Sequence, residues 1–223
     1  MVVGMLSLRD VHLVGTRPVL LGAKGRAGVL DQFNTAVRRP LAHGGLECLP
    51  SLLDALAGGE AAPEGTRWIV DANTRLDMAA LTPYSFPQPE IHVVAAEYGA
   101  AAHARGWLRL DRTMLDREYT RLVDTAEVWA ESDRTLDEVL QAYGRPSVTF
   151  GEPDPHLPKS LGYASGDLTA PLALFHLDEA GDAPSARLLA FRAGDGFFGA
   201  SLSFTPLGNA VADESERRHH HKQ

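Results

Sequence analysis

A glycine-rich segment near the N-terminus has the composition of an anion-binding loop. Residues 22–28 read GAKGRAG and lie between an apolar run of strand character and a segment with helical periodicity. Backbone N–H groups at the start of a helix attract phosphate, and the ammonium group of Lys24 beside Gly25 would add positive charge. The glycine spacing matches neither the dinucleotide-binding pattern nor the P-loop pattern. The segment is therefore interpreted either as a ligand-binding loop that uses Lys24 and Gly25 or as a flexible glycine turn.

Three carboxylate or amide side chains follow apolar runs that are predicted strands. Asp71 and Asn73 come directly after residues 68–70, and Glu97 follows residues 91–95. In open α/β sheets, ligands bind at the carboxyl ends of the strands, and such side chains suit Mg²⁺ held against a phosphate group. Asp71 and Glu97 are therefore candidate catalytic residues, and Asn73 is a candidate ligand-binding residue. The alternative is that Asp71 or Asn73 caps the helix that follows.

Other catalytic and metal-binding arrangements find little support. The internal histidines form no close metal-binding pair, and no serine lies in the G-x-S-x-G motif of α/β-hydrolases. Cys48 is the single cysteine, which excludes an intrachain disulfide, and its apolar surroundings favour a buried thiol over a nucleophile. The sequence predicts no particular cofactor.

An apolar stripe in the middle of the chain has helical spacing. A helix is predicted over residues 108–129, and one face of it carries large apolar side chains at positions Leu115, Tyr119, Leu122 and Trp129. Such a face either packs on the domain core or forms an interface with a protein partner or a second copy of the chain.

A proline-rich loop is the second candidate for partner binding. Residues 154–159 read DPHLPK, which places charged side chains on a stiff backbone, and His156 and Lys159 are the candidate contact residues. Exposed loops of this composition often carry recognition. The alternative is a rigid spacer without a binding role.

Composition places the chain among soluble, acidic globular proteins. Of its 223 residues 44% are hydrophobic and 22% are charged, and its net charge is −8. This balance argues against nucleic-acid binding, which needs a basic face. There is no signal-peptide pattern, and no apolar run approaches the roughly 18 residues of a membrane span. We therefore expect a cytoplasmic protein, and the use of arginine over lysine is typical of a bacterial, GC-rich genome.

The first half of the chain alternates strand and helix patterns. Strands are predicted over residues 11–21, 68–70 and 91–95, and helices over 29–41, 46–57 and 74–81. Glycine pairs and closely spaced prolines separate these runs.

The second half begins with a capped helix and continues with short strands. Thr135 and Glu138 have the spacing of a capping box, and Gly144 with Pro146 marks the end of this helix. Strands are then predicted over residues 147–150, 172–177, 187–192 and 196–204, and glycines at 194 and 196 indicate a hairpin between the last two.

The fold class expected from these patterns is mixed, α/β to α+β. Residues 1–107 form an α/β portion with strand and helix alternation, and residues 108–208 form an α+β portion in which a capped helix precedes an antiparallel β-meander. A single continuous domain is the alternative. Residues 209–223 are expected to be a disordered polar tail.

The segment 135–150 resembles the helix–strand units of small inhibitor and immunity proteins. The resemblance covers a small part of the chain, and no functional residue is carried over from it. The favoured hypothesis is a non-catalytic cytosolic protein of accessory or immunity type, which binds a protein partner or forms a homodimer. The alternative is a small enzyme or ligand-binding protein that acts on a phosphate-bearing molecule, with or without Mg²⁺.

Overall fold

The computed structural model describes residues 25–43, 45–46, 48–58, 91–194 and 201–220. The helices in these ranges are α2 (Gly25–Arg38), the 3-10 helix η2 (Pro40–Ala42), α3 (Cys48–Gly58), α5 (Ile91–His103), α6 (Asp116–Trp129), α7 (Leu136–Tyr143) and α8 (Pro206–His220). The strands are β1 (Val148–Gly151), β2 (Lys159–Tyr163), β3 (Ala173–Asp178), β4 (Arg187–Arg192) and β5 (Leu202–Phe204). The predicted elements at residues 11–21, 68–70 and 74–81 lie outside the described residues.

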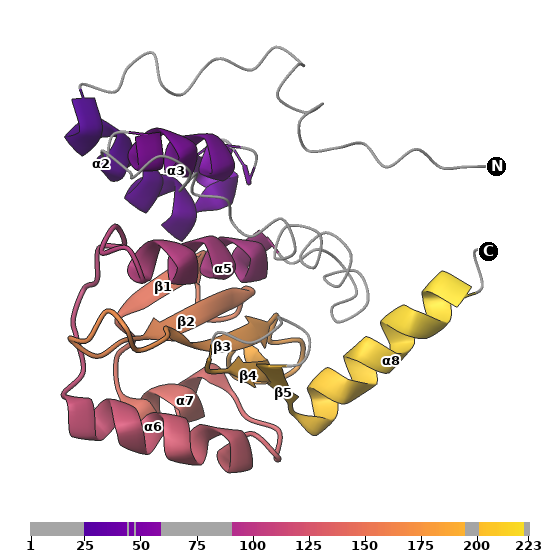
Figure 1. Ribbon diagram of the computed structural model, residues 1–223. Coiled ribbons are helices and arrows are strands. Elements are labelled where there is room, and N and C mark those ends of the chain that lie inside the picture. The colour runs from indigo at the N-terminus through magenta and orange to yellow at the C-terminus, as the bar shows by residue number, and fades with distance from the viewer. Residues whose placement is uncertain (1–24, 44, 47, 59–90, 195–200, 221–223) are drawn as a thin grey trace.

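The elements are stacked in layers (Figure 1). The five strands form one antiparallel sheet in chain order. Helix α5 covers one face of the sheet, α6 and α7 cover the other, and α2 with α3 packs on the far side of α5. Helix α8 leaves the β5 edge and projects away from the sheet (Figure 1). The mixed α+β class and the β-meander after a capped helix are confirmed.

The two faces of the sheet belong to two different apolar clusters because side chains alternate along each strand. On the α5 face, Val148 and Phe150 of β1 pack in one cluster with residues of α2, α3 and α5. On the opposite face, Leu161 and Tyr163 of β2 pack with residues of α6 and α7. The first cluster contains residues from both sides of the boundary predicted at residue 107.

Helix α7 begins where its capping box predicts. The Thr135 hydroxyl accepts a hydrogen bond from the backbone N–H of Glu138, and the Glu138 carboxylate accepts one from the backbone N–H of Thr135 at 2.8 Å. Gly144 follows the helix with a φ of 74°, a conformation that suits glycine. The strands predicted at residues 147–150, 172–177 and 187–192 match β1, β3 and β4 within one residue. Strand β2 was not predicted.

The segment predicted as a strand at residues 91–95 is instead the first part of α5. A short apolar run does not distinguish a strand from a helix that is buried on several sides. Alanines at 95, 96 and 100–102 favour helix by intrinsic propensity. Because α5 lies between the sheet and the α2–α3 layer, its apolar residues show no single-faced period.

Two further boundaries differ from the predictions. The helix expected over residues 108–129 begins at Asp116, and residue 115 precedes it in an extended conformation. The expected disordered tail at residues 209–223 is helical through His220. The Thr205 hydroxyl caps this helix by accepting from the Gly208 backbone N–H at 3.0 Å. Pro206 occupies the first helical position, and Leu207 with Val211 packs near β4 and β5.

None of the helices in the described ranges is long and apolar enough to span a membrane.

Candidate functional site

Three loops at one end of the sheet are joined by backbone hydrogen bonds. Ala180 N–H donates to the carbonyl of His156 at 2.9 Å, and Ala186 N–H donates to the carbonyl of Pro155 at 2.8 Å. Leu136 N–H donates to the carbonyl of Ala186 at 2.7 Å. These bonds connect residues 131–138, 152–158 and 178–186, which we call the three-loop surface. Segments that are far apart in the sequence therefore present one joined surface.

The β1–β2 loop of this surface is held from within by Lys159. Its side chain is 2% exposed, and its ammonium group donates to the Glu152 carbonyl at 2.8 Å and to the Asp154 carbonyl. Burial lowers the pKa of Lys159. The Asp154 carboxylate accepts from the His156 backbone N–H at 2.9 Å, and this bond lowers the pKa of Asp154. The loop predicted from its prolines is therefore ordered, and Asp154 stays ionised at neutral pH.

The three-loop surface carries nine carboxylates and one arginine, a strong excess of negative charge. Glu131, Glu179 and Asp182 are among the exposed ones. The arginine, Arg134, turns back onto α6, where its guanidinium carbon lies 4.8 Å from the centre of the Trp129 ring. Within the described part of the chain, no three His, Cys, Asp or Glu side chains are arranged to hold a metal ion. These carboxylates therefore spread over a surface.

The apolar stripe of α6 faces mainly inward. Tyr119 and Leu122 are buried in the cluster between α6, α7 and the sheet. The half-buried Trp129 ring makes edge contacts with Tyr143 and with Phe175 of β3, with ring centres 5.4 and 6.3 Å apart. Leu115 differs from the others because it precedes the helix and is 56% exposed. Of the two alternatives for this stripe, packing on the core describes three of the four residues.

Glu97 does not lie at the end of a strand. It is on α5, 6% exposed, and forms an ion pair with Arg192 of β4. Burial raises the pKa of Glu97, while Arg192 opposes this shift. The carboxylate is thus turned toward the sheet and away from solvent. Gly25 is the first residue of α2 and is exposed, with a φ of 70°.

Lys24, Asp71 and Asn73 lie outside the described residues. The structure therefore does not place them relative to Glu97 or Gly25.

A buried polar chain links α5 to the sheet beside this ion pair. The Nδ1 atom of His92 lies 2.9 Å from the Ser160 hydroxyl oxygen, which in turn lies 2.8 Å from the Nδ1 atom of His176. Ser160 and His176 are opposite each other on β2 and β3. The exposed fractions of His92, Ser160 and His176 are 6%, 0% and 0%. The sequence did not predict these hydrogen bonds, because the bonded residues are 68 and 16 positions apart.

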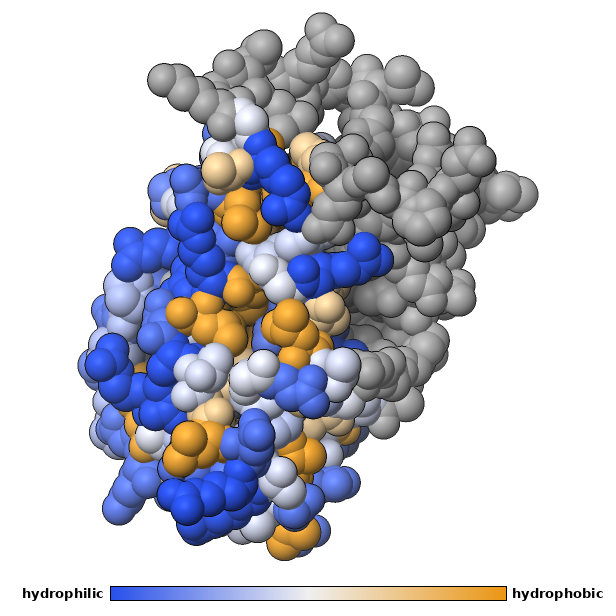
Figure 2. Space-filling model, turned by 60° about the vertical axis from the view of Figure 1, so that its left-hand side comes forward, coloured by the Kyte–Doolittle hydropathy of each residue, from blue (hydrophilic) through white to orange (hydrophobic). Residues whose placement is uncertain are grey.

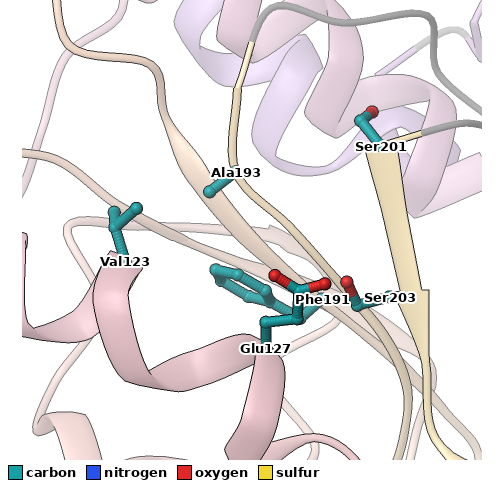
Figure 3. A pocket seen from close by; sticks show the side chains of 6 residues that line it. All are labelled: Val123, Glu127, Phe191, Ala193, Ser201 and Ser203. Atoms are coloured by element: carbon teal, nitrogen blue, oxygen red, sulfur yellow. The ribbon is translucent and has the colours of Figure 1, made fainter.

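A small open groove lies between α6 and the β4–β5 edge (Figure 3). Its volume is about 250 Å³, at the lower end of the roughly 300–1,000 Å³ of small-molecule sites. The Glu127 carboxylate and the Ser203 hydroxyl point toward each other, whereas the Ser201 hydroxyl points away (Figure 3). None of the candidate site residues predicted from the sequence lines this groove.

Exposed apolar side chains are scattered. On the face seen in Figure 2 they lie in several small groups among hydrophilic side chains. The large apolar residues most exposed in the described ranges are Leu41, Leu115, Val128, Leu157 and Leu168. Leu157 is on the three-loop surface, where it is 41% exposed beside exposed His156.

Comparisons of the chain with protein families, with characterised proteins and with solved structures find no match.

Proposed function

We propose that this chain is a non-catalytic, cytosolic protein-binding protein of accessory or immunity type, and that a basic partner docks on its three-loop surface. The observation that carries the proposal is the combination of nine carboxylates with one arginine on loops that are joined by backbone hydrogen bonds. A negative surface attracts and orients a basic partner. Loops that are already ordered lose little conformational entropy on binding.

The positions of the cations also support this proposal. Lys159 is buried beneath the β1–β2 loop, and Arg134 lies over the Trp129 ring. The Arg187 guanidinium, at the start of β4, donates to the Glu179 carbonyl at 3.2 Å. Each of these side chains bonds or stacks inside the chain, while exposed carboxylates face solvent. Arg134 also forms an ion pair with Glu138, with the two side chains 3.6 Å apart. The exposed charged side chains of the three-loop surface are therefore carboxylates.

The burial of reactive residue types favours binding over catalysis in the described part of the chain. Glu97, Ser160 and His176 lie inside the α5–sheet interface and are at most 6% exposed. A group that acts on a substrate must come within hydrogen-bond reach of it. These buried side chains are out of hydrogen-bond reach of a substrate at the surface.

Charge reversal tests the proposal. One variant combines Glu131→Lys, Glu179→Lys and Asp182→Lys on the three-loop surface, all at exposed positions. The matched control combines Asp116→Lys, Glu118→Lys and Asp124→Lys, which are exposed on α6 and change the net charge equally. Proteins captured from a lysate of the source organism by immobilised wild type and variants are quantified by mass spectrometry. Circular dichroism checks that both variants fold.

We expect wild type and the α6 variant to enrich the same protein, and the three-loop variant to enrich it at least about tenfold less, a loss of about 1.4 kcal/mol. Enrichment should also fall at about 1 M salt, where the Debye length is about 3 Å. Equal losses in both variants would contradict docking on the three-loop surface. If no protein is enriched over a blank support, the protein-binding function itself is wrong.

A further inference from the structure

The interface between α5 and the sheet contains titratable groups that hold it together. His92 comes from α5, His176 from β3, and the Ser160 hydroxyl of β2 lies between their Nδ1 atoms at 2.9 and 2.8 Å. The Glu97–Arg192 ion pair crosses the same interface. Polar contacts between layers are usually few in a packed core, because each buried polar group needs a partner.

The geometry of this hydrogen-bonded chain requires at least one unprotonated Nδ1 atom, and it is fully satisfied when both histidines are neutral. A serine hydroxyl has one proton to donate, so it donates to one Nδ1 atom and accepts a hydrogen bond from the other. The two rings must therefore be opposite tautomers. When both rings are protonated, both Nδ1 atoms become donors, and the hydroxyl proton must find a different acceptor. Two positive rings then also flank one oxygen in a region that excludes water.

The charged groups that face the His92–Ser160–His176 chain come from α5 and β4. His92 and Glu97 face it from α5, and Arg192 faces it from β4. The Arg192 Nε–H donates to the Ser201 hydroxyl at 2.7 Å, and α8 contributes apolar side chains nearby. Burial, with a further contribution from the charges of His92 and Arg192, lowers the pKa of His176 well below its ordinary value. Proton uptake by His176 is therefore costly while the interface is closed.

Proton binding by the buried histidine is linked to opening of the interface between α5 and the sheet. A histidine whose pKa is lowered in the closed state binds a proton more readily when the interface opens, so acid favours opening below about pH 6.5. Glu97 acts in the opposite sense, because burial raises its pKa and the closed state takes up its proton first. Glu97 therefore counteracts the histidine effect as the pH falls through its raised pKa.

The sheet can keep its other layer when α5 loosens. The cluster that holds α2, α3 and α5 on the sheet contains Leu53, Ala96 and Phe150. The cluster on the opposite face, which includes Leu122 and Phe175, is formed by residues outside α5. Local opening with a free energy below that of global unfolding is common in proteins with such separate packing units.

We propose that the His92–Ser160–His176 chain is an acid-sensitive latch that holds α5 on the sheet at neutral pH and releases it when His176 is protonated. The released state exposes the α5 face of the sheet while β1–β4, α6 and α7 stay packed. This property does not depend on partner binding at the three-loop surface.

Hydrogen exchange with mass spectrometry on the full chain tests the latch. Protection of residues 91–103 is compared at about pH 7.5 and about pH 5.5, on either side of the ordinary histidine pKa of about 6.5, after correction for the intrinsic exchange rates. We expect opening of α5 to increase at least about tenfold at the lower pH, because His176 stays neutral in the closed state. Residues 116–143 should keep their protection. Equal loss of protection in both regions would indicate global unfolding and overturn the latch.

Variants separate the latch from general acid sensitivity. His176→Gln retains hydrogen-bonding capacity without a titrating ring, so it should lose the part of the pH response that comes from His176, about tenfold. Buried His103 of α5, whose pKa is also lowered by burial, keeps its own contribution in this variant. His176→Asn gives the same test if His176→Gln does not fold. The matched control is His156→Gln, at an exposed histidine of the β1–β2 loop, which should keep the wild-type response. A wild-type pH response in both latch variants, or unchanged α5 protection in the wild type, would overturn the proposal.

Discussion

Lys159 shows how far the position of one side chain can depart from its appearance in the sequence. It ends a charged, proline-rich segment and there resembles a surface contact residue. In the folded chain it begins β2, and its ammonium group turns under the loop to meet the carbonyls of Glu152 and Asp154. It therefore orders the loop that presents His156 and Asp154. Its effect on a partner would be indirect.

Replacing Lys159 by methionine should destabilise the protein. The Lys159→Met variant keeps the length of the side chain but leaves two partly buried carbonyl groups without their charged donor. We expect the free energy of unfolding to fall by about 1–3 kcal/mol, the usual cost of a buried group that loses its hydrogen bond. Urea denaturation measures this change, and hydrogen exchange of residues 152–158 should become faster.

Arg121→Met is the matched control for this prediction. Arg121 is exposed on α6, and a surface substitution of this kind usually changes stability by less than about 0.5 kcal/mol. Equal denaturation curves for the two variants would mean that the Lys159 ammonium group does not support the loop.

At the scale of the elements, α5 joins two layers of the fold. It contacts the sheet on one side and the α2–α3 layer on the other, and nine of its thirteen residues are buried. Close approach to β1 depends on Gly99, because a Cβ atom at this position would overlap the Phe150 ring. The glycine therefore allows the helix to lie against the sheet, although glycine lowers helix propensity.

Gly99→Ala should destabilise the chain although alanine is the better helix former. Alanine favours a helix by about 1 kcal/mol over glycine, but overpacking of a core typically costs about 1–3 kcal/mol. We expect a net loss of stability in urea denaturation. In the double variant with Phe150→Leu, the smaller side chain should reduce the cost of the added methyl group. A gain in stability for Gly99→Ala would mean that α5 and the Phe150 ring of β1 do not pack closely at this position.

At the scale of the whole molecule, two apolar clusters share one sheet. Leu53 of α3 and Leu122 of α6 are fully buried in different clusters on opposite sides of the sheet. Strand β3 connects the clusters, since its side chains alternate between them: Leu174 belongs to the first and Phe175 to the second. This arrangement predicts that the described layers unfold together at neutral pH.

Leu53→Ala and Leu122→Ala test this cooperativity. Each substitution should lower the free energy of unfolding by about 2–5 kcal/mol. Because the two sites share no contact cluster, their effects should add to within about 0.5 kcal/mol in the double variant. Urea denaturation followed by both circular dichroism and fluorescence should give one transition. Two transitions, with Leu53→Ala moving only one of them, would show that the helical layer and the sheet are independent units.

Local signals in the sequence were sufficient for α7 and for three of the five strands of the second half. The capping box of Thr135 and Glu138 predicted the start of α7, and short apolar runs between glycine, proline and aspartate clusters predicted β1, β3 and β4. These features act over a few residues, so their outcome depends little on the rest of the chain. The net charge of −8 likewise follows from composition alone.

Tertiary packing decided the remaining features. Residues 91–95 have the apolar pattern of a strand because α5 is buried between two layers, and this setting hides the period of a helix. Glu97 meets Arg192 across 95 positions, and Lys159 turns inward because the β1–β2 loop folds over it. The three-loop surface exists only after three distant segments have been joined by the sheet. Such contacts depend on which faces are brought together, and a pattern read along the chain contains only the order of its residues.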